Sequence, residues 1–135
     1  MRRLSYAMRL TGRLTPVAAG VLRRVETELP DGARLESELL FADENTFREH
    51  GKLTFGSGSH LCFQTLGTGQ LTPSVDPDLR LGTVTWELDG GRGPFADATG
   101  RITSNFTVGA EGHTEDEQVG LVFLCDWTDE GEEST

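Results

Sequence analysis

Residues 82–108, GTVTWELDGGRGPFADATGRITSNFTV, hold the two most regular strand patterns of the chain and the glycine-rich loop that joins them. Apolar or small residues take every second position on either side of the loop, at Gly82, Val84, Trp86 and Leu88 and at Ile102, Ser104, Phe106 and Val108. A period of two is typical of a strand with one buried face. The four glycines of residues 90–100 permit positive φ, and the loop carries one aromatic residue, Phe95. We expect two strands whose loop crosses one end of a closed sheet, with Phe95 covering that end.

The same period recurs along most of the chain, and clusters of Gly, Pro, Asp and Asn divide it into short segments. Eight strands are expected, at residues 4–10, 21–29, 35–41, 47–55, 61–65, 82–88, 102–108 and 119–123. Breaks are expected at residues 11–16, in a longer loop over residues 70–80, and in an exposed acidic turn that includes residues 113–118. A helix over residues 17–29 is the alternative for that segment, since its apolar residues also fit a period near 3.6, but Gly20 weakens it.

Eight short antiparallel strands predict an all-β fold and close most economically into a barrel, because closure removes exposed strand edges. A barrel of this size is either filled by side chains or holds one small ligand. We expect one domain over residues 1–125. Residues 126–135, which are acidic and lack periodicity, are expected to form a disordered tail.

The composition argues against several classes of partner. A net charge of −10 leaves no basic face to neutralise phosphates, so nucleic acid and anionic membrane are not expected partners. No apolar run typical of a secretory signal follows the first basic residues, which favours a cytoplasmic protein. Cys62, Cys125 and the three histidines lack ligand-like spacing, so no metal is expected.

The loop GGRGPFADATG and the strand that follows it resemble an element of the allene oxide cyclase-like barrels. This calycin-like group includes dirigent proteins and, on a similar barrel, spirotetronate cyclases. The resemblance covers residues 82–108 and implies a small, often oligomeric barrel with an apolar cavity for a hydrophobic small molecule. In the enzymes of the group the cavity folds a reactive substrate so that it cyclises, and no cofactor is needed.

Two functions of different class follow as expectations. The first is a cofactor-independent cyclase or isomerase that acts on a hydrophobic molecule such as a polyketide intermediate. The second is a non-catalytic barrel that binds a hydrophobic ligand or serves as a scaffold. A barrel packed solid with side chains, acting as an interaction protein, is a third alternative.

Glu49 is the candidate catalytic residue. It shares an expected inward face with Phe47, Leu53 and Phe55, and a carboxyl group there would have a raised pKa and serve as a general acid or base. The alternative is a β-bulge at residues 50–51 that turns the side chain to solvent.

Eight residues on expected inward faces or at the barrel end are candidate ligand contacts: Tyr6, Ser37, Phe47, Phe63, Thr65, Trp86, Phe95 and Phe106. Ser37 and Thr65 would donate hydrogen bonds to a ligand carbonyl, or would be satisfied by neighbouring backbone instead. The aromatic residues would stack on a polyene, or would fill the core.

Overall fold

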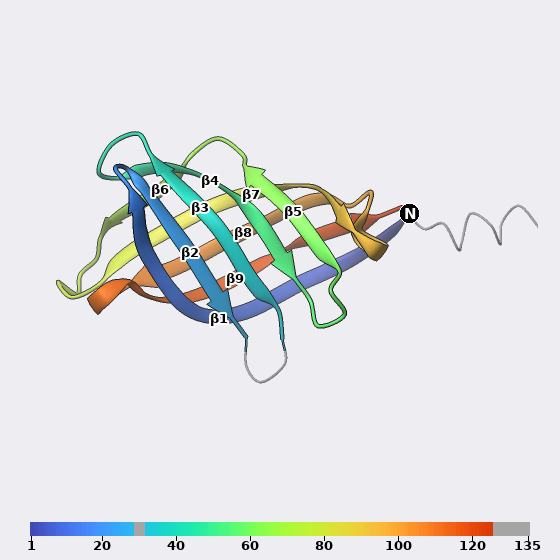
Figure 1. The fold of residues 1–135 in the computed structure, drawn as a ribbon, viewed down its shortest axis with the longest axis horizontal. Helices are drawn as coiled ribbons and strands as arrows, with labels where there is room; N and C mark the ends of the chain where they lie inside the picture. The colour runs from blue at the N-terminus through green and yellow to red at the C-terminus, as the bar shows by residue number, and fades with distance from the viewer. Residues whose placement is uncertain (29–31, 126–135) are drawn as a thin grey trace, which may run out of the picture.

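Nine strands form one closed antiparallel sheet in the computed structural model, which describes residues 1–28 and 32–125 (Figure 1). The strands are β1 (Arg2–Ala18), β2 (Val21–Thr27), β3 (Arg34–Phe41), β4 (Thr46–Thr54), β5 (His60–Thr65), β6 (Gly69–Pro73), β7 (Arg80–Arg92), β8 (Thr99–Val108) and β9 (His113–Leu124). Two 3-10 turns, η1 (Gly93–Phe95) and η2 (Ala110–Gly112), precede β8 and β9. The expected tail at residues 126–135 lies outside the described residues.

The nine strands occupy eight positions around the barrel. The order β3-β2-β1-β9-β8-β7-β5-β4 is closed by pairing of β3 with β4, and β6 shares the place of β5 between β4 and β7. The expected eight-stranded antiparallel barrel is therefore confirmed. The expected loop over residues 70–80 is wrong in its first part, because β6 resumes the ladder there after an interruption at residues 66–68.

Three other expectations about elements are corrected. β1 does not break at residues 11–16 but continues to Ala18, with β2 paired along this second half. The helix alternative for residues 17–29 is wrong, since residues 21–27 form β2. Residues 113–118 are not an exposed turn but the start of β9, paired with β1 and β8. In each case pairing with neighbouring strands decides the structure against the local preference for a turn or a helix.

The glycine-rich loop closes one end of the barrel, beside the N-terminus in Figure 1. Gly90 and Gly93 adopt positive φ values of 72° and 71°, as expected from their lack of a side chain. Phe95 is partly buried against the core, and its ring centroid lies 5.2 Å from that of Phe55. The expectation that Phe95 packs over this end agrees with its position.

Alternate residues of every strand point into the barrel, where leucine and aromatic side chains form most of the core. Phe106 shows how tightly they pack: a β-carbon on Gly82 of the neighbouring strand would lie 2.2 Å from its ring. The middle of the barrel departs from this apolar pattern. Polar and charged side chains there are fully buried, so the expected apolar interior is wrong for the middle layer.

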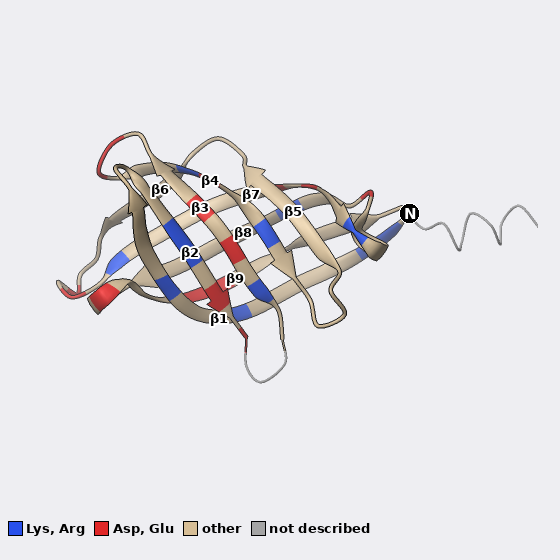
Figure 2. Cartoon of the chain, in the orientation of Figure 1, with Lys and Arg blue, Asp and Glu red and all other residues tan. Residues whose placement is uncertain are grey.

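The outer wall of β2, β3 and β4 carries acidic and basic residues on adjacent strands (Figure 2). Arg23 lies 3.4 Å from Glu36, and His50 lies 3.6 Å from Glu38. These side chains are between 31% and 60% exposed, so their ion pairs contribute little to stability. They form a solvated face, as expected for polar residues that alternate with the core.

Candidate functional site

Arg24 is the centre of the buried polar layer. It shares the inward face of β2 with Leu22 and Glu26, because side chains two positions apart in a strand point the same way. Its side chain has no exposed surface. Three carboxyl groups from three strands surround its guanidinium: Glu26 on β2, Glu49 on β4 and Asp116 on β9. Burial lowers the pKa of Arg24, and these three groups more than reverse that effect, so Arg24 stays charged.

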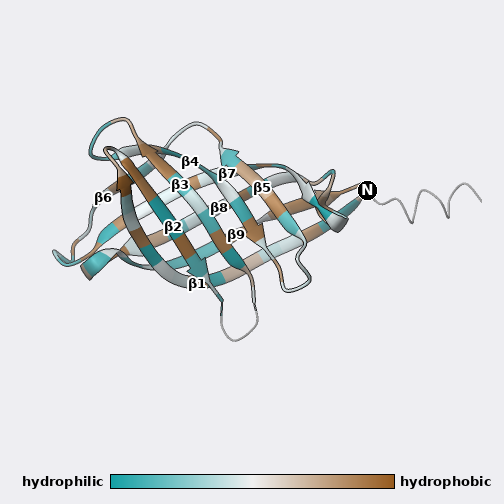
Figure 3. Cartoon of the chain, in the orientation of Figure 1, coloured by the Kyte–Doolittle hydropathy of each residue, from teal (hydrophilic) through white to brown (hydrophobic). Residues whose placement is uncertain are grey.

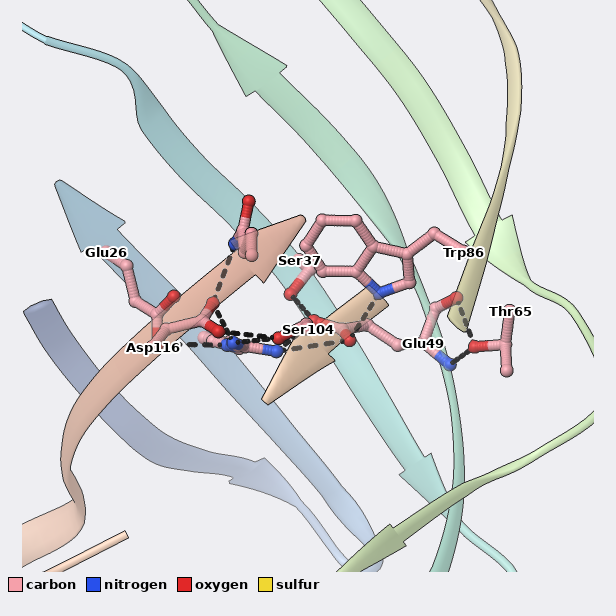
Figure 4. A network of polar contacts seen from close by, with 9 residues as sticks. Glu26, Ser37, Glu49, Thr65, Trp86, Ser104 and Asp116 are labelled. Atoms are coloured by element: carbon pink, nitrogen blue, oxygen red, sulfur yellow. Dashed lines mark hydrogen bonds and ion pairs between the residues drawn. The ribbon is translucent and has the colours of Figure 1, made fainter. Parts of the chain in front are cut away.

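Glu49 lies on one side of Arg24 and receives four hydrogen bonds (Figure 4). Arg24 Nη1 donates to its two oxygens at 3.3 and 3.2 Å. Ser37 Oγ donates at 2.5 Å and Trp86 Nε1 at 2.9 Å. The pairing of β3 with β4 is regular through Glu49, and the side chain is 1% exposed. The alternative of a bulge that turns Glu49 to solvent is therefore wrong.

The Thr65 side chain forms hydrogen bonds with the backbone of Glu49. The two residues face each other where β5 ends and β6 has not yet begun. Thr65 Oγ1 accepts from the Glu49 amide at 2.5 Å and donates to the Glu49 carbonyl at 2.8 Å, so one hydroxyl replaces the missing ladder bonds. Satisfaction by neighbouring backbone, one of the two alternatives for Thr65, is confirmed. Ser37 instead donates to a carboxylate.

Asp116 lies on another side of Arg24 and binds Nη2 directly. Ser104 Oγ accepts from Nη2 and donates to Asp116, both at 2.8 Å. Gln118 Nε2 donates to Asp116 at 2.6 Å, and the Tyr6 hydroxyl donates to Gln118 at 2.6 Å. A continuous chain of polar contacts thus runs from the half-buried Tyr6 on β1 to Thr65 on β5. Each of the eight barrel positions contributes at least one member.

Glu26 differs from the other two carboxyl groups. Arg24 Nε lies 3.1 Å from Oε2, but within the described residues no aligned hydrogen bond reaches either oxygen of Glu26. Burial raises the pKa of Glu26, Arg24 lowers it and Asp116 raises it further, to about 8. Glu26 therefore holds its proton near neutral pH, and the layer contains a buried neutral acid.

Aromatic rings enclose the charged layer. The guanidinium carbon of Arg24 lies 4.0 Å from the ring centroid of Phe106 and 5.9 Å from that of Trp86. Trp86 stacks on Phe63 with centroids 3.9 Å apart. The contacts of the Arg24 guanidinium with the rings of Phe106 and Trp86 add cation–π attraction, which is stronger because the site is shielded from water. Together with the buried leucines, these rings fill the middle of the barrel.

The structure brings most of the predicted site residues together. Tyr6, Ser37, Glu49, Thr65 and Trp86 belong to the polar network, while Phe47, Phe63 and Phe106 are buried around it. Phe95 does not join them, because it lies at the closed end.

Sequence analysis missed Arg24, Glu26, Ser104, Asp116 and Gln118 as site residues. The period-two pattern contained a signal, since Asp116 and Gln118 are in phase with the buried Val122 and Leu124. The expected strand over residues 119–123 instead rests on the apolar residues of the opposite phase, and two of these, Val119 and Leu121, are 55% and 42% exposed. Both faces of β9 hold apolar residues, so the pattern by itself favoured the wrong one.

An apolar hollow of about 530 Å³, here called the mouth pocket, lies at the end of the barrel opposite Phe95. The inward residues Leu22, Phe41 and Leu71 line it, with Asp43, Glu44 and Arg80 among its polar residues. Figure 3 shows hydrophobic segments of β2 and β3 gathered at this end. The Phe41 ring contacts the core through Phe47, with ring centroids 5.4 Å apart. The ring centroid of Phe47 in turn lies 6.3 Å from that of Phe106.

No family model, curated protein or solved structure matches the chain. Residues 1–28 and 32–125 contain no helix that is long and apolar enough to cross a membrane. Within the same ranges no three His, Cys, Asp or Glu side chains are placed to hold a metal ion.

Proposed function

We propose that this barrel binds a hydrophobic small molecule in the mouth pocket. The observation that carries the proposal is an open hollow of about 530 Å³ at the end of a closed barrel, to which the inward-facing Leu22, Phe41 and Leu71 contribute apolar surface. Ligand sites are typically concave and mostly apolar, with a few polar groups that orient the ligand. The mouths of β-barrels are among the places where they occur.

The mouth, and not the middle of the barrel, is the proposed location. Arg24, its three carboxyl partners and Trp86 occupy the middle layer with 0–1% exposure. A ligand there would have to displace a buried ion-pair network and leave charges without partners, which costs several kcal/mol. None of the residues that line the mouth pocket belongs to that network, so a ligand can bind without disturbing it.

The test is binding of the neutral probe N-phenyl-1-naphthylamine, followed by its fluorescence. Phe41→Ala removes an aromatic wall of the mouth pocket, and we expect affinity to fall about tenfold, as for loss of roughly 1.4 kcal/mol of apolar contact. Leu40→Ala is the matched control, because Leu40 directly precedes Phe41 in β3 and is 44% exposed on the outer wall. Equal affinities for the two variants, or no binding by the wild type, would contradict the proposal.

A second candidate is the cofactor-independent cyclisation or isomerisation implied by the resemblance to allene oxide cyclase-like barrels. The observation that favours it is Glu26, a buried acid that holds its proton near neutral pH and is thus suited to general-acid catalysis. A substrate would enter past Leu22, which is the inward neighbour of Arg24 on β2. Part of the network would then have to open for the substrate to meet Glu26.

Turnover is the test of this second candidate. Linear polyene epoxides incubated with the protein should be consumed and yield cyclic products of equal mass, detected by chromatography and mass spectrometry. Glu26→Gln should abolish turnover and retain binding of the neutral probe. Equal turnover by Glu26→Gln and wild type would remove Glu26 from the mechanism, and no turnover with any such substrate would leave ligand binding as the function.

A further inference from the structure

Arg80 is the cationic member of the mouth pocket, and the inference drawn from it rests on the proposed function of that pocket. Arg80 begins β7, where it pairs with Pro73 of β6 and Val108 of β8. Its Nη2 donates to the carbonyl oxygens of Glu44 at 3.1 Å and Leu71 at 3.2 Å. These two bonds hold the planar guanidinium in one orientation beside the apolar lining.

The charge of Arg80 has no carboxylate partner among the described residues. Some other arginines of the barrel have one, such as Arg9 with Glu117 and Arg23 with Glu36, whereas others, such as Arg48 on the outer face of β4, have none among the described residues. Backbone carbonyls orient a guanidinium but do not neutralise it, and its remaining N–H groups suit a planar anion. Arg80 is exposed to solvent, and it lies beside the apolar lining of the mouth pocket, where a ligand can reach it.

The nearby acidic groups limit the anion that can bind. Asp43 Oδ1 accepts the amides of Asn45 and Thr46, both at 2.8 Å, and these bonds lower its pKa, so that it stays ionised. Asp43 and Glu44 both line the mouth pocket with Arg80. Two carboxylates and one guanidinium give these groups a net charge of −1, so a doubly charged head group such as a phosphate monoester meets about twice the net repulsion that a singly charged one meets. A head group with a single negative charge is the better match.

We infer that the mouth pocket takes an amphipathic carboxylic acid, with its carboxylate on Arg80 and its hydrocarbon part against Leu22, Phe41 and Leu71. The ligand class is thus an aliphatic or aromatic monocarboxylate. The two bonds from Nη2 to backbone keep the guanidinium in place before the ligand arrives, which reduces the entropy lost on binding.

The experiment compares 11-(dansylamino)undecanoic acid with its primary amide, which has the same hydrocarbon and fluorophore but no charge. The wild type should bind the acid about tenfold more tightly than the amide, a typical gain for a charge-assisted bidentate contact. Arg80→Gln should remove this preference, so that the variant binds the acid and the amide equally. Arg48→Gln is the matched control, because it removes the same charge from the outer face of β4, outside the mouth pocket, and should keep the preference.

The outcomes separate this inference from the proposed function. If the wild type binds acid and amide equally, or if Arg80→Gln keeps the preference, the monocarboxylate is wrong and the apolar site stands. If neither probe binds, and the neutral naphthylamine does not bind either, the proposed function itself fails. Undecyl phosphate should compete with the acid less well than undecanoate does, and stronger competition by the phosphate would overturn the assignment of a single negative charge.

Discussion

Arg24 lies between two buried glutamates, Glu49 and Glu26, which differ in the hydrogen bonds that reach their carboxyl groups. Glu49 and Glu26 are 1% and 0% exposed, and both contact the same guanidinium. Glu49 also receives hydrogen bonds from Ser37 and Trp86, whereas no described group makes an aligned hydrogen bond to Glu26. The comparison shows that a single cation does not compensate three buried carboxyl groups. Burial and the neighbouring Asp116 raise the pKa of Glu26 by more than Arg24 lowers it, so Glu26 keeps its proton near neutral pH.

The network has a structural consequence apart from ligand binding. A buried ion-pair cluster is weak evidence for added stability, because desolvation offsets most of its Coulomb energy, but breaking one partner is costly. Here the members come from all eight barrel positions, and a slip of one residue in any strand would turn its member outward. We therefore expect the network to select the register of the barrel.

The largest expected change in the free energy of unfolding comes from replacing Glu49, the glutamate with four hydrogen bonds to its carboxylate. Glu49→Gln places an amide N–H₂ among donors from Ser37, Trp86 and Arg24 and removes the charge that faces Arg24. We expect the free energy of unfolding to fall by about 3 kcal/mol, the usual range for a buried pair that loses one partner. Urea denaturation followed by tryptophan fluorescence measures it.

Glu38→Gln is the control for this change, since Glu38 lies on the outer face of β3 with a 50% exposed side chain. It should alter the free energy of unfolding by less than about 0.5 kcal/mol. Similar losses for the two variants would show that the hydrogen bonds to Glu49 do not stabilise the barrel.

Glu26 is expected to make a smaller contribution to the free energy of unfolding, one that depends on pH. The folded state keeps the proton of Glu26 up to about pH 8, while the unfolded chain releases it near 4.5, so the folded state binds more protons between these values. This difference lowers the free energy of unfolding as pH rises from about 4.5 to about 8, by up to about 1.4 kcal/mol per pH unit. Glu26→Gln, which cannot ionise, should lack this decline. Thermal unfolding of both proteins from pH 5 to pH 9 measures the difference.

Tyr6, Asp116 and Glu28 also lie near this side of the network, so the informative quantity is the difference between variant and wild type. The gap between the two stability curves should change steadily from about pH 5 to about pH 8, in favour of Glu26→Gln, and stay constant above that pH. Curves that stay parallel from pH 5 to pH 8 would show that Glu26 has the same proton affinity in the folded and unfolded states. In that case burial beside Arg24 would not change the proton affinity of Glu26.

The sequence predicted the site unevenly, and the reason differs from one residue to another. Glu49 and Trp86 lie in strands whose inner faces are clearly more apolar than their outer faces, so the phase of the pattern was unambiguous. In β2 the buried positions are held by Arg24 and Glu26, while Val25 lies on the other face. A pattern that equates buried with apolar assigns such a strand to the wrong face. The mouth pocket also could not be predicted, because it is formed by the ends of several strands.

What the sequence determined by itself is the period of two, the glycine-rich turn that brings Phe95 over one end, and enough strands to close a barrel. Local backbone geometry controls these features, so local residues suffice to predict them. Only the tertiary structure decided which face of β2 and β9 turns inward, and that Arg24 meets Asp116, 92 positions later in the chain. Closure of the sheet fixes the facing of all strands together, and a charged side chain is tolerated inside only because its partners arrive from other strands.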